Sequence, residues 1–553
     1  KLDRILIQNS GLDVWLAQAK FIQNNLTETI IDKAFSKIPE EVQEDNLETI
    51  RLNLLSRKNK LIETARDYHD YLNSLVILTG TDKDDFIEVI REEKNKTRVK
   101  IRRNKGGEKA DFLVNRVFDR KLTKELWIYG LDDKDQFMVS GKASNPIKIR
   151  LIGGQENDSY TIESGRKIRI YDHHSKPNTI VQRGSAKLKL TDFYNFNTYD
   201  FKKYNYSSGI FTPLFGFNPD DGILTGISLN KTNYGFERNP FTARHNLRFG
   251  YYFATNGFDV RYSGEYNVVQ QWNLHVSALY TSNNFTRNFF GFGNNTTNND
   301  DNLGFDYNRV RTSIYQFKVG MLKKAPFGSD YGIRAIFEGF KLNSTEDRFI
   351  TDLVPNNNTE FYDRNFFAGL EGIFTYKSFD NAVNPTRGMT FDIDAGAKRE
   401  FKSNENTFGY LDSHLGFYNS LSKNRKLVLK TDLRTQLRLG EDIPFFQSAN
   451  IGGQTGLRAY RTQRFTGQNS FIGSGDLRYS FDSFKTKLLP LQIGVFTGYD
   501  LGRVWVDNDA SNTWHSSYGG GFWIASADSI AGTFNLFNGA DGLRFSFGFG
   551  INF

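Results

Sequence analysis

The chain has 553 residues, a formal net charge of +8 and no cysteine, so disulfide and thiolate chemistry are excluded. Its 71 lysines and arginines are spread along the sequence, which argues against nucleic-acid binding because that function needs a clustered basic patch. No stretch approaches the roughly 20 apolar residues of a membrane helix, whereas frequent aromatics and glycines are typical of many strands joined by turns.

The first part of the chain predicts a small α+β domain. Apolar residues recur at helical spacing over 12–22 and again over 47–72, which predicts two long amphipathic helices. Short β segments follow over 75–180. We therefore expect a helical and α+β region at 1–110 and a β-rich linker domain at 111–205.

From about Tyr206 the pattern changes to segments of about ten residues in which apolar and polar side chains alternate. We count sixteen such segments, of which the first, Gly209–Phe217, is weakened as a strand by Pro213. A soluble β protein would bury one face of each strand in a packed core. A membrane barrel places the apolar face in lipid and keeps a polar lumen.

The last strand favours the membrane barrel. One face of it is apolar and the other carries only Ser, Gly and Asn; the apolar face consists of Phe545, Phe547, Phe549, Ile551 and Phe553. This strand resembles the C-terminal sorting signal of bacterial outer-membrane proteins. The predicted fold class is mainly β: a 16-stranded transmembrane β-barrel at 206–553, in the bacterial outer membrane, preceded by a small α+β domain.

One loop interrupts the alternating strands. The stretch Ile451–Phe465 carries three glycines and the arginines Arg458, Arg461 and Arg464. Within it, the run GLRAYR at Gly456–Arg461 resembles the Val-Arg-Gly-Phe/Tyr signature of the sixth loop in the BamA/TamA superfamily of outer-membrane insertases and two-partner transporters.

Further motifs resemble that superfamily in the same order along the chain: NPTRGMTFDI (384–393), GSGDLRYSF (473–481), VFTGYDLGRVW (495–505) and GLRFSFGFGINF (542–553). The chain departs from the family at Leu457 and Ala459, which replace Val and Gly, and at Asp476, which replaces Glu. Because glycine adopts a positive φ far more readily than alanine, Ala459 leaves the conformation of the loop open.

The resemblance implies that Arg458 latches the loop to Asp500 on the inner wall, with Asp476 as a second candidate partner and with Gly456 and Tyr460 as parts of the same motif. A guanidinium paired with a carboxylate gives a geometrically specific anchor for a loop inside a wet lumen. The alternative is that all three loop arginines are exposed charges that contact solvent or lipid headgroups.

No complete catalytic motif is present, so we expect no enzyme activity, no metal and no cofactor in this chain. The linker region resembles Bacteroidetes-type members of the superfamily, in which a calcineurin-like metallophosphoesterase precedes the barrel. Such a domain would lie before Lys1, because Asp67–His69 and Asp172–His174 match only fragments of its metal motifs. Gly153–Tyr160 resembles one imperfect calcium-binding repeat, for which a β-turn is the default interpretation.

The resulting hypothesis is a barrel that assists insertion or translocation of outer-membrane or surface proteins. Its partners would be outer-membrane lipids, client proteins and other envelope assembly proteins. The mechanism would use a weak seam between the last strand, with Phe549, Ile551 and Phe553, and either Gly222–Asn230 or its predecessor. The alternatives are a passive membrane anchor for an attached domain and a diffusion pore.

Overall fold

A computed structural model describes residues 2–7, 10–39, 47–269, 271–354, 358–401, 407–486, 490–507, 509–526 and 530–550. The chain forms two compact units, Lys1–Asn205 and Tyr206–Phe553. Within the described ranges, no helix is long and apolar enough to cross a membrane.

The first unit begins with helices: α1 (Leu2–Ile7), α2 (Leu12–Asn25), α3 (Glu28–Phe35), α4 (Leu47–Asn59) and α5 (Leu61–Asn73). Helix α2 packs on α5, where Trp15 meets Tyr68 edge to face with ring centroids 5.9 Å apart. The single helix expected over 47–72 is wrong, because it divides into α4 and α5 at Lys60. The run before that break, Ser56–Lys60, contains only polar residues. It therefore has no apolar side chain whose burial would stabilise one continuous helix.

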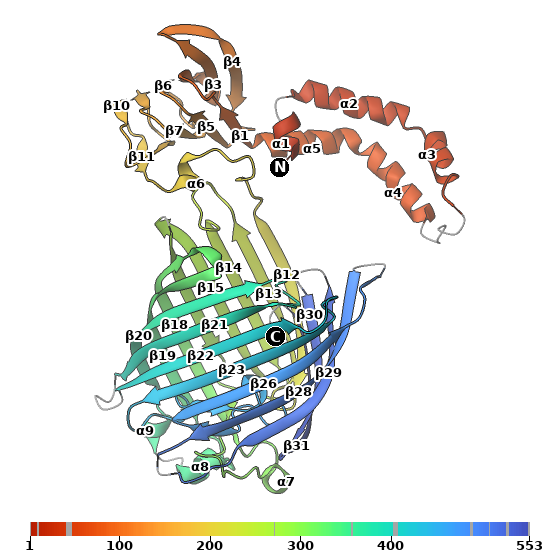
Figure 1. Cartoon of the computed structure of the whole chain (residues 1–553), viewed down its shortest axis with the longest axis vertical. Helices are drawn as coiled ribbons and strands as arrows, with labels where there is room; N and C mark the ends of the chain where they lie inside the picture. The colour runs from red at the N-terminus through yellow and green to blue at the C-terminus, as the bar shows by residue number, and fades with distance from the viewer. Residues whose placement is uncertain are drawn as a thin grey trace. The chain divides into compact units, whose positions relative to one another are not determined.

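Two sheets complete this unit (Figure 1). Their strands are β1 (Leu75–Thr79), β2 (Asp85–Arg91), β3 (Lys96–Lys105), β4 (Glu108–Asp119), β5 (Glu125–Leu131), β6 (Gln136–Gly141), β7 (Lys148–Gly154), β8 (Ser159–Ile162), β9 (Ile168–Asp172), β10 (Thr179–Gln182) and β11 (Lys187–Leu190), followed by the short helix α6 (Tyr194–Asn197). One sheet has the order β1-β5-β7-β9-β11 and the other β10-β8-β6-β2-β3-β4. Apart from the β3–β4 hairpin, the chain alternates between parallel strands of the two sheets, so it winds as a coil around one hydrophobic core.

The sequence analysis did not predict this coil, which joins the two regions that it separated at residue 110. Strand β4 runs through residue 110, and its sheet holds strands from both sides of that position. Residues 1–110 and 111–205 are therefore parts of one compact unit.

The second unit is a closed barrel (Figure 1). Its strands are β12 (Ser208–Asn218), β13 (Gly222–Asn233), β14 (Ala243–Tyr252), β15 (Gly257–Val269), β16 (Trp272–Thr281), β17 (Phe285–Asn288), β18 (Arg309–Lys324), β19 (Ser329–Asn343), β20 (Asn365–Phe379), β21 (Gly388–Glu400), β22 (Thr407–Ser420), β23 (Leu427–Leu439), β26 (Asn469–Ser480), β27 (Phe484–Lys485), β28 (Pro490–Trp505), β29 (His515–Ser526), β30 (Ile530–Gly539) and β31 (Gly542–Gly550). Because β17 continues β16 and β27 continues β26, the described residues form a 16-strand antiparallel barrel. This confirms the predicted fold class.

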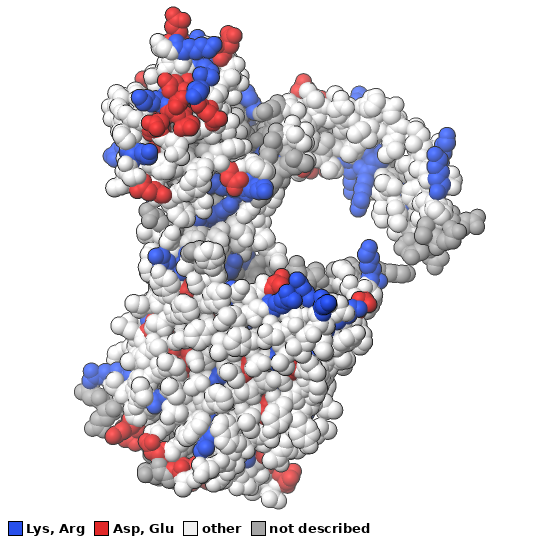
Figure 2. Space-filling view, viewed as in Figure 1, with Lys and Arg blue, Asp and Glu red and all other residues white. Residues whose placement is uncertain are grey.

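Side chains alternate between the outside and the inside of the barrel. On β28, for example, Val495 and Tyr499 are exposed, whereas Asp500 and Val504 are buried. Figure 2 shows that charged residues are sparse on the visible side of the barrel and gather toward its ends. The short helices α7 (Asp300–Leu303), α8 (Phe349–Leu353) and α9 (Thr359–Tyr362) lie in loops at one end of it (Figure 1). We call that end the α7 rim.

Candidate functional site

The loop between β23 and β26 folds against the inner wall. It contains β24 (Ala449–Ile451), the short 3-10 helix η4 (Gly453–Thr455) and β25 (Phe465–Gly467), and β24 pairs antiparallel with β25. Its apolar side chains are buried in a cluster with wall residues from β26, β28 and β30; the members are Ile451, Leu457, Ala459, Tyr460, Phe465, Ile472, Val504 and Phe537. We call Ile451–Gly467 the latch loop.

Arg458 binds both carboxylates that the sequence comparison named. Its Nη2 lies 2.7 Å from Oδ1 of Asp500 and 2.6 Å from Oδ1 of Asp476. The backbone N–H of Arg458 also donates to Asp500 (2.9 Å), as does the Ser517 hydroxyl (2.6 Å). The Asp500 side chain is fully buried, and the guanidinium carbon lies 3.9 Å from the centroid of the Phe537 ring. This geometry is a buried, charge-assisted anchor between the loop and strands β26 and β28.

Glycines make room for this anchor. A Cβ atom at Gly498 would lie 2.2 Å from the carboxylate of Asp476 and 2.6 Å from the guanidinium of Arg458. Gly456, with φ 113°, presses against Ile472, where a Cβ would meet the side chain at 2.2 Å. The left-handed conformation falls on Leu457 (φ 58°), whereas Ala459 has no positive φ. The substitution that left the loop conformation open in the sequence is therefore accommodated without strain at Ala459.

The other two arginines are buried as well, so in the structure they are not exposed loop charges. Arg461 has a side chain with 0% exposure and donates from Nε to Asp220 (2.8 Å). Arg464 donates from Nε to Asp541 (2.7 Å). Both partners lie in hairpin turns far from the loop in sequence, and nothing in the local pattern around Arg461 or Arg464 identified them.

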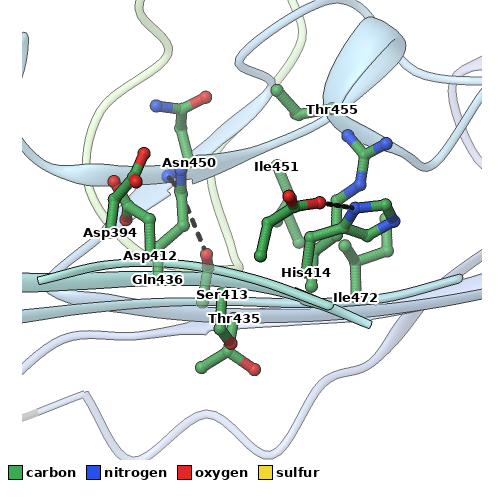
Figure 3. Close-up of a pocket in the computed structure, with 13 residues that line it drawn as sticks. Asp394, Asp412, Ser413, His414, Thr435, Gln436, Asn450, Ile451, Thr455 and Ile472 are labelled. Carbon is green, nitrogen blue, oxygen red and sulfur yellow. Dashed lines mark hydrogen bonds and ion pairs between the residues drawn. The ribbon is translucent and has the colours of Figure 1, made fainter. Parts of the chain in front are cut away.

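A polar pocket of about 370 Å³ lies beside the latch loop. Figure 3 shows wall residues Asp394, Asp412 and His414 facing Asn450, directly before the latch loop, and Thr455 within it. Two ionisable groups of this wall hold partners: His414 lies between Asp392 (3.3 Å) and Asp432 (2.8 Å), and Asp412 accepts from Arg438 (2.6 Å). Among the described side chains, no group of three or more His, Asp or Glu is arranged to hold a metal ion. The pocket is a polar part of the barrel lumen.

The barrel closes between its first strand, β12, and its last, β31. The described residues of this seam pair only as Phe215 with Phe549, Gly216 with Gly548, and Phe217 with Phe547. Strand β12 is thus the segment that contains Pro213, the predecessor of Gly222–Asn230. The predicted seam residues Ile551 and Phe553 lie outside the described residues.

Pro213 lacks a backbone N–H on the side of β12 that faces the seam. The N–H of Phe253 donates to the carbonyl of Ile223 in the β13–β14 ladder. Since backbone groups of successive residues point to opposite sides of a strand, even-numbered residues of β13 face β12. The register then directs odd-numbered residues of β12, Pro213 among them, toward β31. Proline has no N–H, so this edge of the first strand is one donor short.

The first unit contains a buried stack of aspartates, which includes Asp158 of the Gly153–Tyr160 run and Asp172 of the Asp172–His174 fragment, although the sequence analysis did not connect them. The N–H of Asp85 donates to Asp135 (2.9 Å), and that of Asp135 donates to Asp158 (2.8 Å). Their carboxyls are almost completely buried, as is Asp172, which accepts from Tyr160 (2.7 Å). The sequence pattern that could have indicated this stack is Gly-x4-Asp, which begins at Gly80, Gly130 and Gly153. Each Asp carboxyl lies against the glycine five residues before it, in space that a Cβ atom would fill.

Burial raises the pKa of Asp135 to about 9, with the neighbouring Asp158 as the next cause. Burial, followed by Asp172, raises the pKa of Asp158 to about 8. The stack therefore holds protonated carboxyls near neutral pH. Asp172 belongs to this stack, and His69 of the other fragmentary metal motif contacts Asp70 within helix α5.

No family model matches the sequence, and no curated protein matches it. Solved structures to which this chain is similar include the following three. BamA from Haemophilus ducreyi lacking POTRA domains 1-3 is 15% identical, with 62% of this chain and 70% of that chain covered and a TM-score of 0.45. CdiB from Acinetobacter baumannii is 12% identical, with 63% of this chain and 60% of that chain covered and a TM-score of 0.40. CdiB from Escherichia coli is 12% identical, with 62% of each chain covered and a TM-score of 0.42. The chain thus spans less than two thirds of each CdiB.

Proposed function

We propose that this chain is an outer-membrane β-barrel that assists the insertion or translocation of outer-membrane or surface proteins through the seam between β12 and β31. The observation that carries the proposal is the seam itself. Three described residue pairs close it, whereas the neighbouring β12–β13 ladder is paired along the whole of β12. A barrel normally removes its sheet edges by closing fully. Over the described residues, the β12–β31 ladder is the shorter of the two ladders that β12 makes.

The chemistry of the two faces supports a membrane location. Large apolar side chains are exposed on the outer faces of the strands, as at Ile333 (65%) and Leu370 (65%). Charged groups inside form paired networks, such as Glu371 with Arg334 and Lys318. Exposed apolar bands are costly in water and favourable in lipid, while buried charge pairs suit a wet lumen.

A short seam gives a mechanism for insertion. When β12 and β31 separate, each presents unpaired N–H and C=O groups in a hydrophobic environment. A client strand that pairs with one of these edges satisfies those groups and is placed in register for its own barrel. The missing donor at Pro213 lowers the number of hydrogen bonds that must break first.

Reconstitution tests the proposal. The purified chain in liposomes should speed the folding of a urea-denatured outer-membrane barrel into those liposomes, relative to liposomes that contain an unrelated barrel. Equal folding rates in the two would contradict the proposal.

A passive anchor is the second candidate, and one observation favours it: residues 1–205 form a compact unit with its own hydrophobic core. Deleting these residues separates the two functions. If the remaining barrel still speeds client folding, insertion resides in the barrel. If the chain without residues 1–205 assembles as a barrel but no longer speeds client folding, the anchor is favoured.

A diffusion pore is the least supported alternative, because the latch loop lies inside the barrel and is fixed to its wall by Arg458.

A further inference from the structure

Two arginines of the latch loop reach the two hairpins that border the seam. Arg461 binds Asp220, in the turn between β12 and β13, through Nε at 2.8 Å. The backbone N–H of Thr462 donates to the same carboxylate at 2.8 Å. The loop therefore holds the hairpin that begins the barrel.

The same loop also holds the hairpin that ends the barrel. Arg464 donates from Nε to Asp541, in the turn between β30 and β31, at 2.7 Å. The Tyr460 hydroxyl accepts a hydrogen bond from the N–H of Ala540 at 3.3 Å, in the same turn. A short span of the loop thus connects the two ends of the sheet at the α7 rim.

A direct ion pair crosses the seam beside these contacts. Arg544 of β31 donates from Nη2 to Asp220 at 3.0 Å. The Asp220 side chain is 5% exposed and that of Arg544 is 12% exposed. Because these charges lie away from water, their attraction is screened far less than that of a surface pair.

We propose that these contacts form a seam clasp, consisting of Arg461–Asp220, Arg464–Asp541 and Arg544–Asp220, which keeps β12 and β31 together at the α7 rim. The inference rests on the proposed function only in taking the seam as the place that opens. It adds that opening at this rim requires the latch loop to release one hairpin.

The contacts also indicate which hairpin is released. Arg458 and Arg464 fix the loop to the C-terminal half of the barrel, at Asp500 and Asp541. Among the described contacts of these three arginines, only those of Arg461 include ion pairs to the N-terminal half, at Asp220 and at Asp300 of α7 (2.7 Å). Arg464 adds two hydrogen bonds to Thr296 in that half. The clasp therefore separates at Asp220, which must leave both Arg461 and Arg544, while the loop stays ion-paired to the side of β31 through Arg464.

Hydrogen–deuterium exchange of the full chain in lipid nanodiscs tests the clasp without any client protein. The peptides to follow are those of β12 and β31. Arg461→Gln should speed their exchange by roughly tenfold or more, because losing a buried, charged hydrogen bond should raise the opening equilibrium constant by at least about tenfold. Arg364→Gln is the matched control: Arg364 donates to Ser313, away from the seam, and its loss should leave these peptides within about twofold of wild type.

A second pair of variants keeps the test decisive if Arg461→Gln does not assemble. Asp541→Asn should speed exchange in the same peptides. A disulfide formed by Gly216→Cys with Gly548→Cys, in a chain that has no other cysteine, should return the exchange of Asp541→Asn or Arg461→Gln to the wild-type rate. Exchange that matches the Arg364→Gln control in both clasp variants would overturn the clasp.

The result is independent of the proposed function. If the clasp variants loosen the seam but wild type does not speed client folding, the clasp stands and insertion is wrong. If wild type speeds client folding and the clasp variants leave exchange unchanged, insertion stands and the clasp is wrong.

Discussion

Removing the Arg458 side chain is the sharpest perturbation of the latch. In Arg458→Ala, Asp500 keeps the backbone N–H of residue 458 and the Ser517 hydroxyl as donors, but it loses its counter-ion while fully buried. Asp476 loses its contact with the guanidinium as well. Breaking a buried ion pair typically costs 3–5 kcal/mol. Because the Arg458 side chain is 21% exposed and Asp500 retains two donors, we expect about 3 kcal/mol of lost unfolding free energy.

Denaturant unfolding of the barrel in lipid vesicles measures this loss, with Arg425→Ala as a control. Arg425 is half-exposed, and its ion pair with Asp380 spans 3.7 Å, so its loss should cost less than about 1 kcal/mol. In a double-mutant cycle, Asp500→Asn should cost little more once Arg458 is absent. Additive costs, or an Arg458→Ala midpoint equal to that of the Arg425→Ala control, would refute the latch.

Three further predictions concern other parts of the chain. Gly498→Ala should weaken the latch by about 1–3 kcal/mol in the same unfolding assay, because its Cβ would meet Asp476; Gly475→Ala, with open space around its Cβ, should not. The first unit should lose stability as pH rises from about 5 to about 9, because the folded-state pKa values of Asp135 (about 9) and Asp158 (about 8) are raised above those of the unfolded chain. Each proton that only the folded state holds contributes up to about 1.4 kcal/mol of lost unfolding free energy per pH unit. Urea midpoints followed by circular dichroism should fall over this range, Asp135→Asn should flatten the dependence, and a flat or rising wild-type profile would contradict the protonated stack. Replacing 452–466 by a short Gly-Ser linker should raise single-channel conductance, and unchanged conductance would show that the loop does not fill the lumen.

The strands of the barrel could be predicted because each carries its own signal. A strand with lipid on one side and a polar lumen on the other must alternate at every residue, whatever its neighbours are. The coil of the first unit has no such signal. Its strands face a shared core and pair with strands many residues away, as β2 pairs with β6, so the sequence showed β segments without their order in the two sheets.

The site could be predicted only in part. Arg458, Asp500 and Asp476 were named because motifs of a resembled family mark them. The partners of Arg461 and Arg464 depend on the path that the loop takes through the barrel, and Asp220 and Asp541 lie in ordinary turns. The backbone strain expected near Ala459 falls on Leu457 instead, because the turn is set by the close approach of Gly456 to Ile472.

The central claim is that clients pass through the seam, and locking the seam tests it most directly. The chain with Gly216→Cys and Gly548→Cys should speed client folding in liposomes when reduced and lose that activity when oxidised. Folding rates should recover when the disulfide is reduced again. If the oxidised chain, with its disulfide verified, folds clients as fast as the reduced chain, the seam is not the route and the account is wrong.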